Sequence, residues 1–129
     1  KVVKLMIKKG QKILNSKVLV LGITFKENCP DIRNTKVVDV VHELEKFGCD
    51  VDIYDPWADP VEVKKEYGLE ILPVTNHSSQ ITNSYNAIVL AVSHDQFKAL
   101  DYPKLTNGSN SVIFDIKSVL PNDFADSRL

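Results

Sequence analysis

Residues 17–35, KVLVLGITFKENCPDIRNT, decide the fold class of this 129-residue chain. Their first part is an apolar run ending at Gly22, which predicts a buried β-strand, and a long polar loop follows it. In a parallel α/β sheet, the loop after the first strand lies at the edge where ligands bind. This loop carries Lys26, Asp31 and Arg33, so we expect it to receive a negatively charged group.

The glycine pattern excludes the two common phosphate-binding loops. No two of the five glycines lie two positions apart, so the sequence contains neither G-x-G-x-x-G nor a P-loop. A bound anion would therefore be held by side chains as well as by backbone amides, and Lys26 and Arg33 are the nearest cations. The spacing leaves an alternative equally open, in which Arg33 only pairs with Asp31 or caps the loop.

Length and composition indicate one globular domain. With 43% hydrophobic and 26% charged residues, the chain can bury a core and is not disordered. Its net charge of −1 gives no field that attracts nucleic acid or a membrane, and no membrane span or secretory signal is visible. Cys29 and Cys49 are too few for a disulfide framework and show no metal-ligand spacing, so we expect a reduced, cytoplasmic setting without a metal.

The first residues predict a helix that continues from a larger protein. Residues 1–7, KVVKLMI, contain five apolar side chains without a preceding N-cap, more apolar surface than one helix face of a small domain needs. We expect residues 1–15 to be the end of an interdomain helix and residues 16–129 to form the globular domain. The apolar helix face would favour self-association of the fragment.

Apolar segments alternate with helical patterns along the rest of the chain. We expect strands at residues 17–22, 50–54, 69–72, 87–92 and 111–115. Valines and a leucine at helical spacing predict a helix from Val37 that ends before Gly48. The sequence Asp59-Pro60-Val61-Glu62 predicts the capped start of a second helix, which Gly68 ends, and a short helix is expected at 94–100.

This alternation predicts an α/β fold with a three-layer, doubly wound, five-stranded parallel sheet, Rossmann-like but without the glycine fingerprint and preceded by a truncated helix. The expected strand order is 3-2-1-4-5, which places the topological switch point between strands one and four. Three loops converge there: residues 24–33, Ser93 with His94, and residues 115–117.

We interpret Asp55, 33 residues after Gly22, as a turn residue, because the acid of a dinucleotide site follows its glycines by about 20 residues. His94 is expected to be a cap or hydrogen-bonding group, and Trp57 to pack at a domain edge.

Residues 22–35, GITFKENCPDIRNT, followed by VVDVVHELEKFGCDVDIYDPWAD, give the chain a specific resemblance. It resembles the C-terminal, UDP-sugar-binding domain of the UDP-glucose/GDP-mannose dehydrogenase family, and is most similar to bacterial enzymes that oxidise UDP-N-acetylhexosamines to uronic acids. The pairing of G-x-x-F-K with D-x-R, the strand ending in YDP and the late F-D-x-K are specific in combination. The resemblance runs from about residue 17 through FDIKSVLP.

The resemblance implies an NAD-dependent enzyme of surface polysaccharide biosynthesis that oxidises C6 of the sugar to a carboxylate in two hydride transfers. In this family a catalytic Cys and the dinucleotide-binding fold lie upstream of such a domain, so we expect no catalytic residue here and no activity from this chain alone. By position, Phe25, Lys26 and Lys117 would bind the UDP-sugar, and Arg33 would reach NAD across the domain cleft. The expected partners are the UDP-sugar, the other domains of the same chain and further copies in a homo-oligomer.

Three departures from the family pattern qualify these roles. Cys29 stands where Thr is common and is expected to be a small buried side chain rather than the catalytic thiol. Lys117 stands where Arg is common, so a point charge replaces a bidentate contact. Thr35-Lys36 replaces the frequent Ser-Pro and is expected to alter only the helix start.

Two other functions are alternatives. A receiver-like signalling domain has a similar size and topology, and Ser93 and Lys117 would suit it, but strand one ends without paired acids and strand three without an acceptor Asp. A free-standing nicotinamide-binding domain is disfavoured by the missing glycines.

Overall fold

The computed structural model of the chain describes residues 16–33, 35–72, 85–98, 112–115 and 127–128. Along the chain its elements are β1 (Lys17–Leu21), α2 (Val37–Lys46), β2 (Asp50–Tyr54), α3 (Pro60–Tyr67), β3 (Ala87–Leu90), α4 (Asp95–Lys98), β4 (Val112–Asp115) and β5 (Ser127–Arg128). The predicted truncated helix and its apolar face, at residues 1–15, lie outside the described residues. No helix in the described ranges is both long and apolar enough to cross a bilayer.

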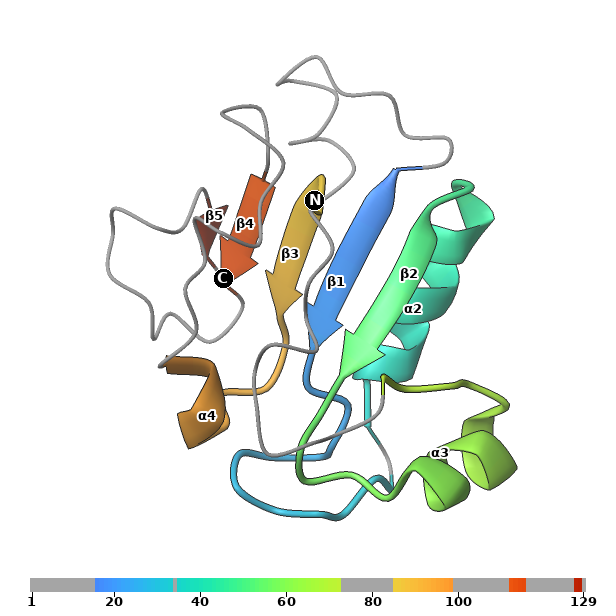
Figure 1. The fold of residues 1–129 in the computed structure, drawn as a ribbon, viewed down its shortest axis with the longest axis vertical. Helices are drawn as coiled ribbons and strands as arrows, with labels where there is room; N and C mark the ends of the chain where they lie inside the picture. Colours follow the sequence, from blue (N-terminus) through green and yellow to red (C-terminus); the bar gives the residue numbers. More distant parts are fainter. Residues whose placement is uncertain (1–15, 34, 73–84, 99–111, 116–126, 129) are drawn as a thin grey trace.

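The strands form one parallel sheet in the order β2-β1-β3-β4-β5 (Figure 1). Within it, β1 lies between β2 and β3, so that Val18 is paired with Val51 on one side and with Ala87 on the other. The chain leaves β1 toward β2 and then crosses to β3 on the opposite side. This reversal confirms the predicted doubly wound class and the predicted switch point between the first strand and the strand at residue 87.

The prediction of a strand at residues 69–72 is wrong. Leu69 and Ile71 are buried, and the Leu72 N–H donates to the Ile53 carbonyl at 2.7 Å, so the segment lies beside β2 without a strand ladder. Pro73 follows at once and has no N–H to extend the pairing. The fifth strand is instead β5, which pairs with β4 at the opposite edge of the sheet.

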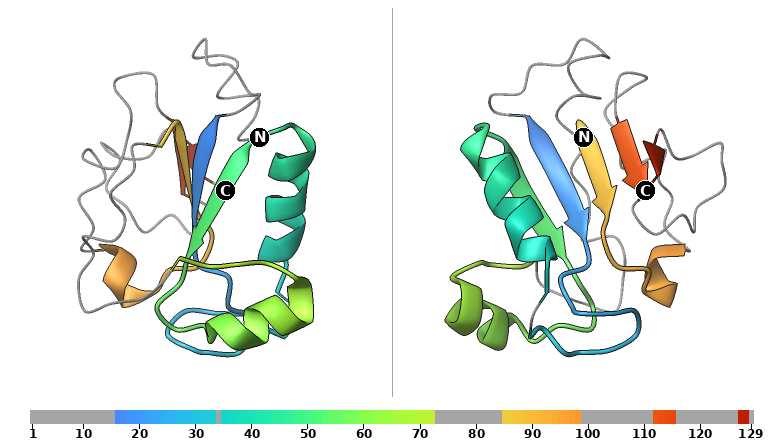
Figure 2. Two further views of the ribbon diagram at one scale, coloured as in Figure 1. Left: turned by 45° about the vertical axis from the view of Figure 1, so that its right-hand side comes forward. Right: turned by 180° about the vertical axis from the view of Figure 1, so that it is seen from behind.

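Two hydrophobic clusters cover the two faces of the sheet. Alternate residues of a strand point to opposite faces, and β1 accordingly contributes Val18 and Val20 to one cluster and Leu19 and Leu21 to the other. The first cluster also contains side chains of α2 and α3, and the second contains Phe97 of α4. Figure 2 shows α2 and α4 on opposite sides of the sheet, which confirms the predicted three-layer arrangement.

The helix boundaries follow the expected signals. Thr35 Oγ1 accepts a hydrogen bond from Val37 N–H at the start of α2, and Gly48 follows its end with a φ of 84°. The Asp59 carboxylate caps α3 by accepting from Val61 N–H at 2.9 Å, with Pro60 at the first helical position. In α2 the buried residues recur at helical spacing: Val37, Val38, Val41 and Leu44.

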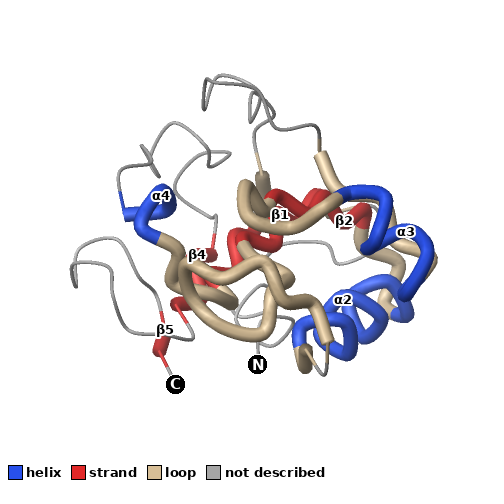
Figure 3. The backbone as a smooth tube through the Cα atoms, turned by 90° about the horizontal axis from the view of Figure 1, so that it is seen from below, coloured by secondary structure: helices blue, strands red, loops and turns tan. Residues whose placement is uncertain are grey.

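All the parallel strands point their carboxyl ends toward one edge, and the loops that follow β1 and β2 lie at the strand ends there (Figure 3). Gly22 brings the end of β1 against the end of β3. Its φ is +97°, and a Cβ at this position would lie 2.5 Å from the Val92 Cβ. The amides of Ala91 and Val92 both donate to the Leu21 carbonyl. A side chain at residue 22 would therefore separate the two loops that form the site described next.

Candidate functional site

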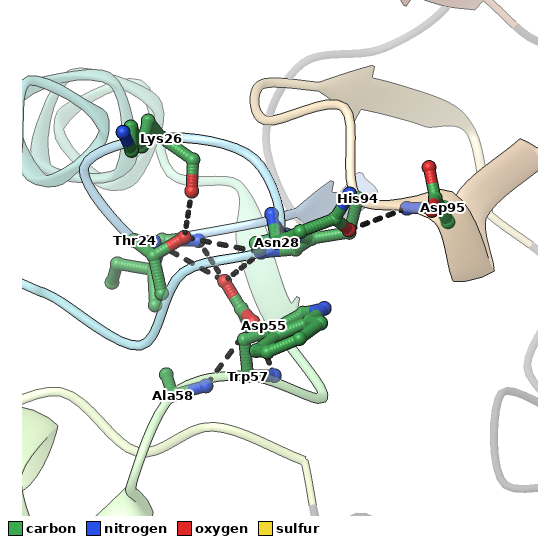
Figure 4. A network of polar contacts seen from close by, with 9 residues as sticks. Thr24, Lys26, Asn28, Asp55, Trp57, Ala58, His94 and Asp95 are labelled. Carbon is green, nitrogen blue, oxygen red and sulfur yellow. Dashed lines mark hydrogen bonds and ion pairs between the residues drawn. The ribbon is translucent and has the colours of Figure 1, made fainter.

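A buried polar network lies at the carboxyl-terminal edge of the sheet, at the switch point (Figure 4). Thr24 follows β1, Asp55 follows β2 and His94 follows β3, and each of these residues is at most 1% exposed. Three loops far apart in the sequence therefore meet in one set of hydrogen bonds. The predicted convergence of residues 24–33 with His94 is confirmed.

The Asp55 carboxylate organises two of these loops. Its Oδ1 accepts from the N–H groups of Trp57 and Ala58, at 2.8 and 3.2 Å, which confirms the predicted turn role. Its Oδ2 accepts from the N–H groups of Ile23 and Thr24, at 2.7 and 3.2 Å. One side chain thus fixes both its own turn and the first residues of the loop after β1.

His94 supplies a further hydrogen bond to this carboxylate, and the network assigns its tautomer. The Asn28 N–H donates to His94 Nδ1 at 2.8 Å, so Nδ1 carries no proton. The Thr24 hydroxyl donates to the Lys26 carbonyl at 3.0 Å and is therefore an acceptor toward the ring. His94 Nε2–H then donates to Asp55 Oδ2 at 3.0 Å and to Thr24 Oγ1 at 3.1 Å. His94 is a neutral imidazole and, as expected, a hydrogen-bonding group.

Opposing effects act on the ionisation of Asp55. Burial by itself raises the pKa of its carboxyl, but the hydrogen bonds from His94 and from the backbone N–H groups of Ile23 and Trp57, together with the electrostatic effect of His94, lower it by more. The pKa of Asp55 is therefore lowered below its ordinary value, and the group is ionised at neutral pH.

Asn28 ties the loop after β1 to α4, a role that the sequence analysis missed. Its backbone has a φ of 53°, in the left-handed region, and its Oδ1 accepts from Asp95 N–H at 3.0 Å. Asn is among the residues that tolerate this conformation best, which was the available sequence signal. The pairing with His94 Nδ1 could not be read from the sequence, because it requires the packing of β1 beside β3.

Four backbone amides of the loop after β1 already have acceptors within the protein. The amides of Ile23 and Thr24 are taken by Asp55, that of Phe25 by the Asp31 carbonyl at 2.6 Å, and that of Asn28 by His94. Because these N–H groups already have acceptors, an anion here depends on side chains more than expected. Lys26 is exposed, and it forms no ion pair with the residues that the structure describes.

Arg33 and Asp31 form the ion pair that was the alternative to an anion-binding role. Arg33 Nε and Nη2 donate to Asp31 Oδ1 and Oδ2 at 3.0 and 3.2 Å. The pair lowers the pKa of Asp31 and raises the pKa of Arg33. The Arg33 side chain is nevertheless 83% exposed, at the rim of a groove of about 340 Å³ between this loop and α3. The observed pair leaves its predicted role toward NAD untested.

The remaining predicted residues have different outcomes. Phe25 is 57% exposed, and its contact with the UDP-sugar stays a prediction; Lys117 lies outside the described residues. Cys29 is only half-buried, because it lies in the exposed loop, so the prediction of a buried side chain is wrong. Cys49 is buried, and burial raises the pKa of its thiol. The Trp57 ring lies 6.0 Å from the His94 ring between centroids, and its place at a domain edge stays a prediction.

Within the described ranges, no cluster of His, Cys, Asp or Glu side chains is arranged to hold a metal ion. A doubly wound parallel sheet with a polar, charged loop at its switch point defines a Rossmann-like ligand-binding domain. Residues 19–122 match the sequence profile of the UDP-glucose/GDP-mannose dehydrogenase family, UDP binding domain. The chain belongs to this family, and the prediction of its C-terminal, UDP-sugar-binding domain is confirmed.

Individual relatives agree with this assignment. The chain is 50% identical over 129 residues to a UDP-N-acetyl-D-glucosamine 6-dehydrogenase of Salmonella typhi, a match that covers 98% of this chain and 29% of the relative. It is 36% identical over 124 residues to Protein CapL of Staphylococcus aureus, covering 95% and 28%. An NDP-N-acetyl-D-galactosaminuronic acid dehydrogenase of Methanosarcina mazei has a similar structure, with a TM-score of 0.78 and 26% identity, covering 95% and 25%. The chain thus spans less than a third of the length of these relatives.

Proposed function

We propose that this chain binds the nucleotide part of a UDP-N-acetylhexosamine within an NAD-dependent 6-dehydrogenase. The observation that carries the proposal is the 50% identity to a UDP-N-acetyl-D-glucosamine 6-dehydrogenase over nearly the whole chain. The full-length enzyme would convert the C6 hydroxyl to a carboxylate for the synthesis of a surface polysaccharide. The free cysteines, Cys29 and Cys49, support a cytoplasmic setting.

Lys26 and Phe25 are the proposed substrate contacts in the described part of the chain. The Lys26 ammonium would pair with the diphosphate, since the amides of Ile23, Thr24 and Asn28 are occupied within the protein. The exposed Phe25 ring offers an apolar face to the nucleotide or the sugar. Lys117 follows β4 in the sequence and would add a second cation at the same edge of the sheet.

Among the described residues, Arg33 is the side chain that we propose contacts NAD. The sequence lacks the glycine fingerprint of a dinucleotide loop, so this domain cannot hold the pyrophosphate in the usual way. A guanidinium has five N–H donors, and Asp31 occupies those of Arg33 Nε and Nη2, which leaves donors for a phosphate oxygen of NAD. When bound, NAD supplies the acceptor for hydride. In this proposal the chain binds and orients, and the reacting groups come from the rest of the enzyme.

The proposal is tested by assaying the full-length protein with UDP-N-acetylglucosamine and its hexosamine epimers in the presence of NAD. We expect two NADH for each sugar oxidised with the preferred epimer, and no NADH from the 129-residue chain under the same conditions. Turnover by the short chain that depends on Cys29 or Cys49 would contradict the assignment, as would a full-length protein that oxidises none of these sugars.

A further inference from the structure

We propose that neutral His94 is a positioning residue that holds the loop after β1 in its binding conformation, and that protonation of His94 Nδ1 releases this loop. The inference rests on the proposed function, because the loop carries Lys26. His94 is not proposed to touch the substrate. It acts through the two ends of a short loop segment, residues 24–28.

The His94 ring is a rigid support. Its side chain is fully buried, and its ring centroid lies 5.3 Å from that of Phe97 and 6.0 Å from that of Trp57. Asp55 Oδ2 accepts from Nε2 at 3.0 Å, and the same carboxylate is fixed by backbone N–H groups. Packing and hydrogen bonding therefore hold the ring in one orientation.

The two nitrogens of this ring hold the two ends of the segment that carries Lys26. At one end, the Thr24 hydroxyl accepts from Nε2 and donates to the Lys26 carbonyl. At the other end, Nδ1 accepts the Asn28 N–H at 2.8 Å (Figure 4). Asn28 has a positive φ, which Asn tolerates better than most residues, and the bond from its N–H to Nδ1 fixes this end of the segment. The imidazole therefore acts together with Asp55 and the Asp31 carbonyl, which hold the amides of Thr24 and Phe25, to place the segment that carries Lys26.

Protonation changes only one of these contacts. In the imidazolium both nitrogens are donors, so an Nδ1–H would face the Asn28 N–H and the bond would be lost. Nε2–H would keep its bond to Asp55. Among the described residues, Asp55 is the charged group that contacts the ring. The other neighbours are the uncharged Thr24, Asn28 and the two aromatic rings, while the Asp95 side chain, on α4, is exposed. A proton on Nδ1 and the bond from the Asn28 N–H exclude each other, so loop position and protonation are linked.

Two substitutions at His94 distinguish the roles of its two ring nitrogens. The side-chain oxygen of Asn lies at the same bond distance from Cβ as Nδ1, so His94→Asn keeps an acceptor for Asn28 N–H but does not titrate. The amide nitrogen of Gln corresponds to Nε2, so His94→Gln keeps a donor for Asp55 and loses that acceptor. The matched control is His42→Asn, at an exposed histidine of α2.

The experiment is calorimetric titration of the full-length protein with UDP-N-acetylglucosamine, without NAD, from about pH 8 to about pH 5, where histidines titrate. This probe is preferred to UDP, whose terminal phosphate titrates near about pH 6. We expect affinity to fall on acidification in the wild type and in His42→Asn. His94→Asn should keep its affinity with a flat profile at acid pH, and His94→Gln should bind about tenfold more weakly already at pH 8.

Each outcome separates this inference from the proposed function. A wild type that binds neither UDP-N-acetylglucosamine nor its galacto epimer would refute the proposed function. A wild type that binds, with His94→Gln unchanged in affinity and pH profile, would refute only the role of His94. If His94→Gln does not fold, NMR of the wild type with selectively ¹⁵N-labelled Asn and His replaces it. The chemical shift of the Asn28 amide should change over the same pH range as that of His94 Nδ1. Changes over different pH ranges would overturn the inference.

Discussion

At the scale of single residues, Asp55 makes the strongest prediction about stability. Its carboxylate accepts from four backbone N–H groups and from His94. Asp55→Asn turns one acceptor oxygen into a donor NH₂ that faces other donors, so we expect it to lower the free energy of unfolding by about 3 kcal/mol. Urea unfolding measures this change. The control Asp50→Asn removes an exposed pair with Lys17 and should cost less than about 1 kcal/mol; equal losses in both variants would contradict the account.

The same carboxylate predicts a pH dependence of stability. Its pKa is lower in the folded chain than in the unfolded chain, where it is about 3.9. The stabilisation by ionised Asp55 is therefore complete above about pH 4 and is lost as the pH falls through the lowered folded-state pKa. Urea unfolding of the wild type and of Asp55→Asn over a pH series should show their difference shrinking only at acid pH. A difference that grows on acidification would show that the pKa is raised.

A substitution at Arg33 tests whether this residue contacts NAD or only forms an ion pair with Asp31. In the full-length enzyme, Arg33→Lys should raise the KM for NAD and leave the KM for the UDP-sugar unchanged, because Lys cannot grip phosphate oxygens with a planar fork. The melting temperature should not change, since the side chain is 83% exposed. A loss confined to the UDP-sugar would move Arg33 to the substrate site. A large drop in melting temperature would instead assign it only to its pair with Asp31.

The sequence predicted the individual roles of Asp55 and His94, but not the hydrogen bond between them. Asp55 as a turn residue and His94 as a hydrogen-bonding group were each deduced from position in the chain. Their hydrogen bond joins residues 39 positions apart and depends on the order of β2, β1 and β3, which local patterns do not specify. The tautomer of His94 needs Asn28, whose backbone conformation is set by the closed loop itself.

At the scale of elements, the contact between the ends of β1 and β3 can be tested with two glycines. Gly22 and Gly68 both have positive φ, but a Cβ at Gly22 would clash with Val92, whereas nothing lies within 4 Å of one at Gly68. Gly68→Ala should therefore cost about 1 kcal/mol for backbone strain alone. Gly22→Ala adds the displacement of the β3 end and should cost about 3 kcal/mol. If both variants lower the free energy of urea unfolding equally, the close approach of Gly22 to Val92 does not contribute to stability.

The elements with a strong apolar pattern or capped ends were predictable from the sequence, whereas residues 69–72 and β5 were not. The apolar run of β1 and the capped ends of α3 gave correct boundaries within a residue. Residues 69–72 have the composition of a strand but form a single backbone bond to β2 before Pro73. The two residues of β5 carry no apolar pattern, and their strand conformation comes from pairing with β4.

At the scale of the whole molecule, the chain is a member of a UDP binding domain family, and we propose that the reacting groups come from the rest of the enzyme. The buried network occupies the amides of Ile23, Thr24 and Asn28, and the exposed Lys26 and Phe25 remain as the surface that a UDP-sugar would meet. The rest of the relatives' length, more than two thirds, lies outside the matched region. Fold and family could be derived from the sequence, because the loop motif and the alternation of elements are local. The substrate epimer could not, because no local motif of this sequence specifies it.

The most direct test of the central claim, that this chain binds the nucleotide sugar, is steady-state kinetics of Lys26→Ala in the full-length enzyme. Lys46→Ala, at an exposed lysine of α2, is the matched control. Loss of a charge-assisted contact to the diphosphate should raise the KM for UDP-N-acetylglucosamine at least about tenfold, with the KM for NAD unchanged. A KM for the UDP-sugar equal to that of Lys46→Ala and wild type would contradict the claim.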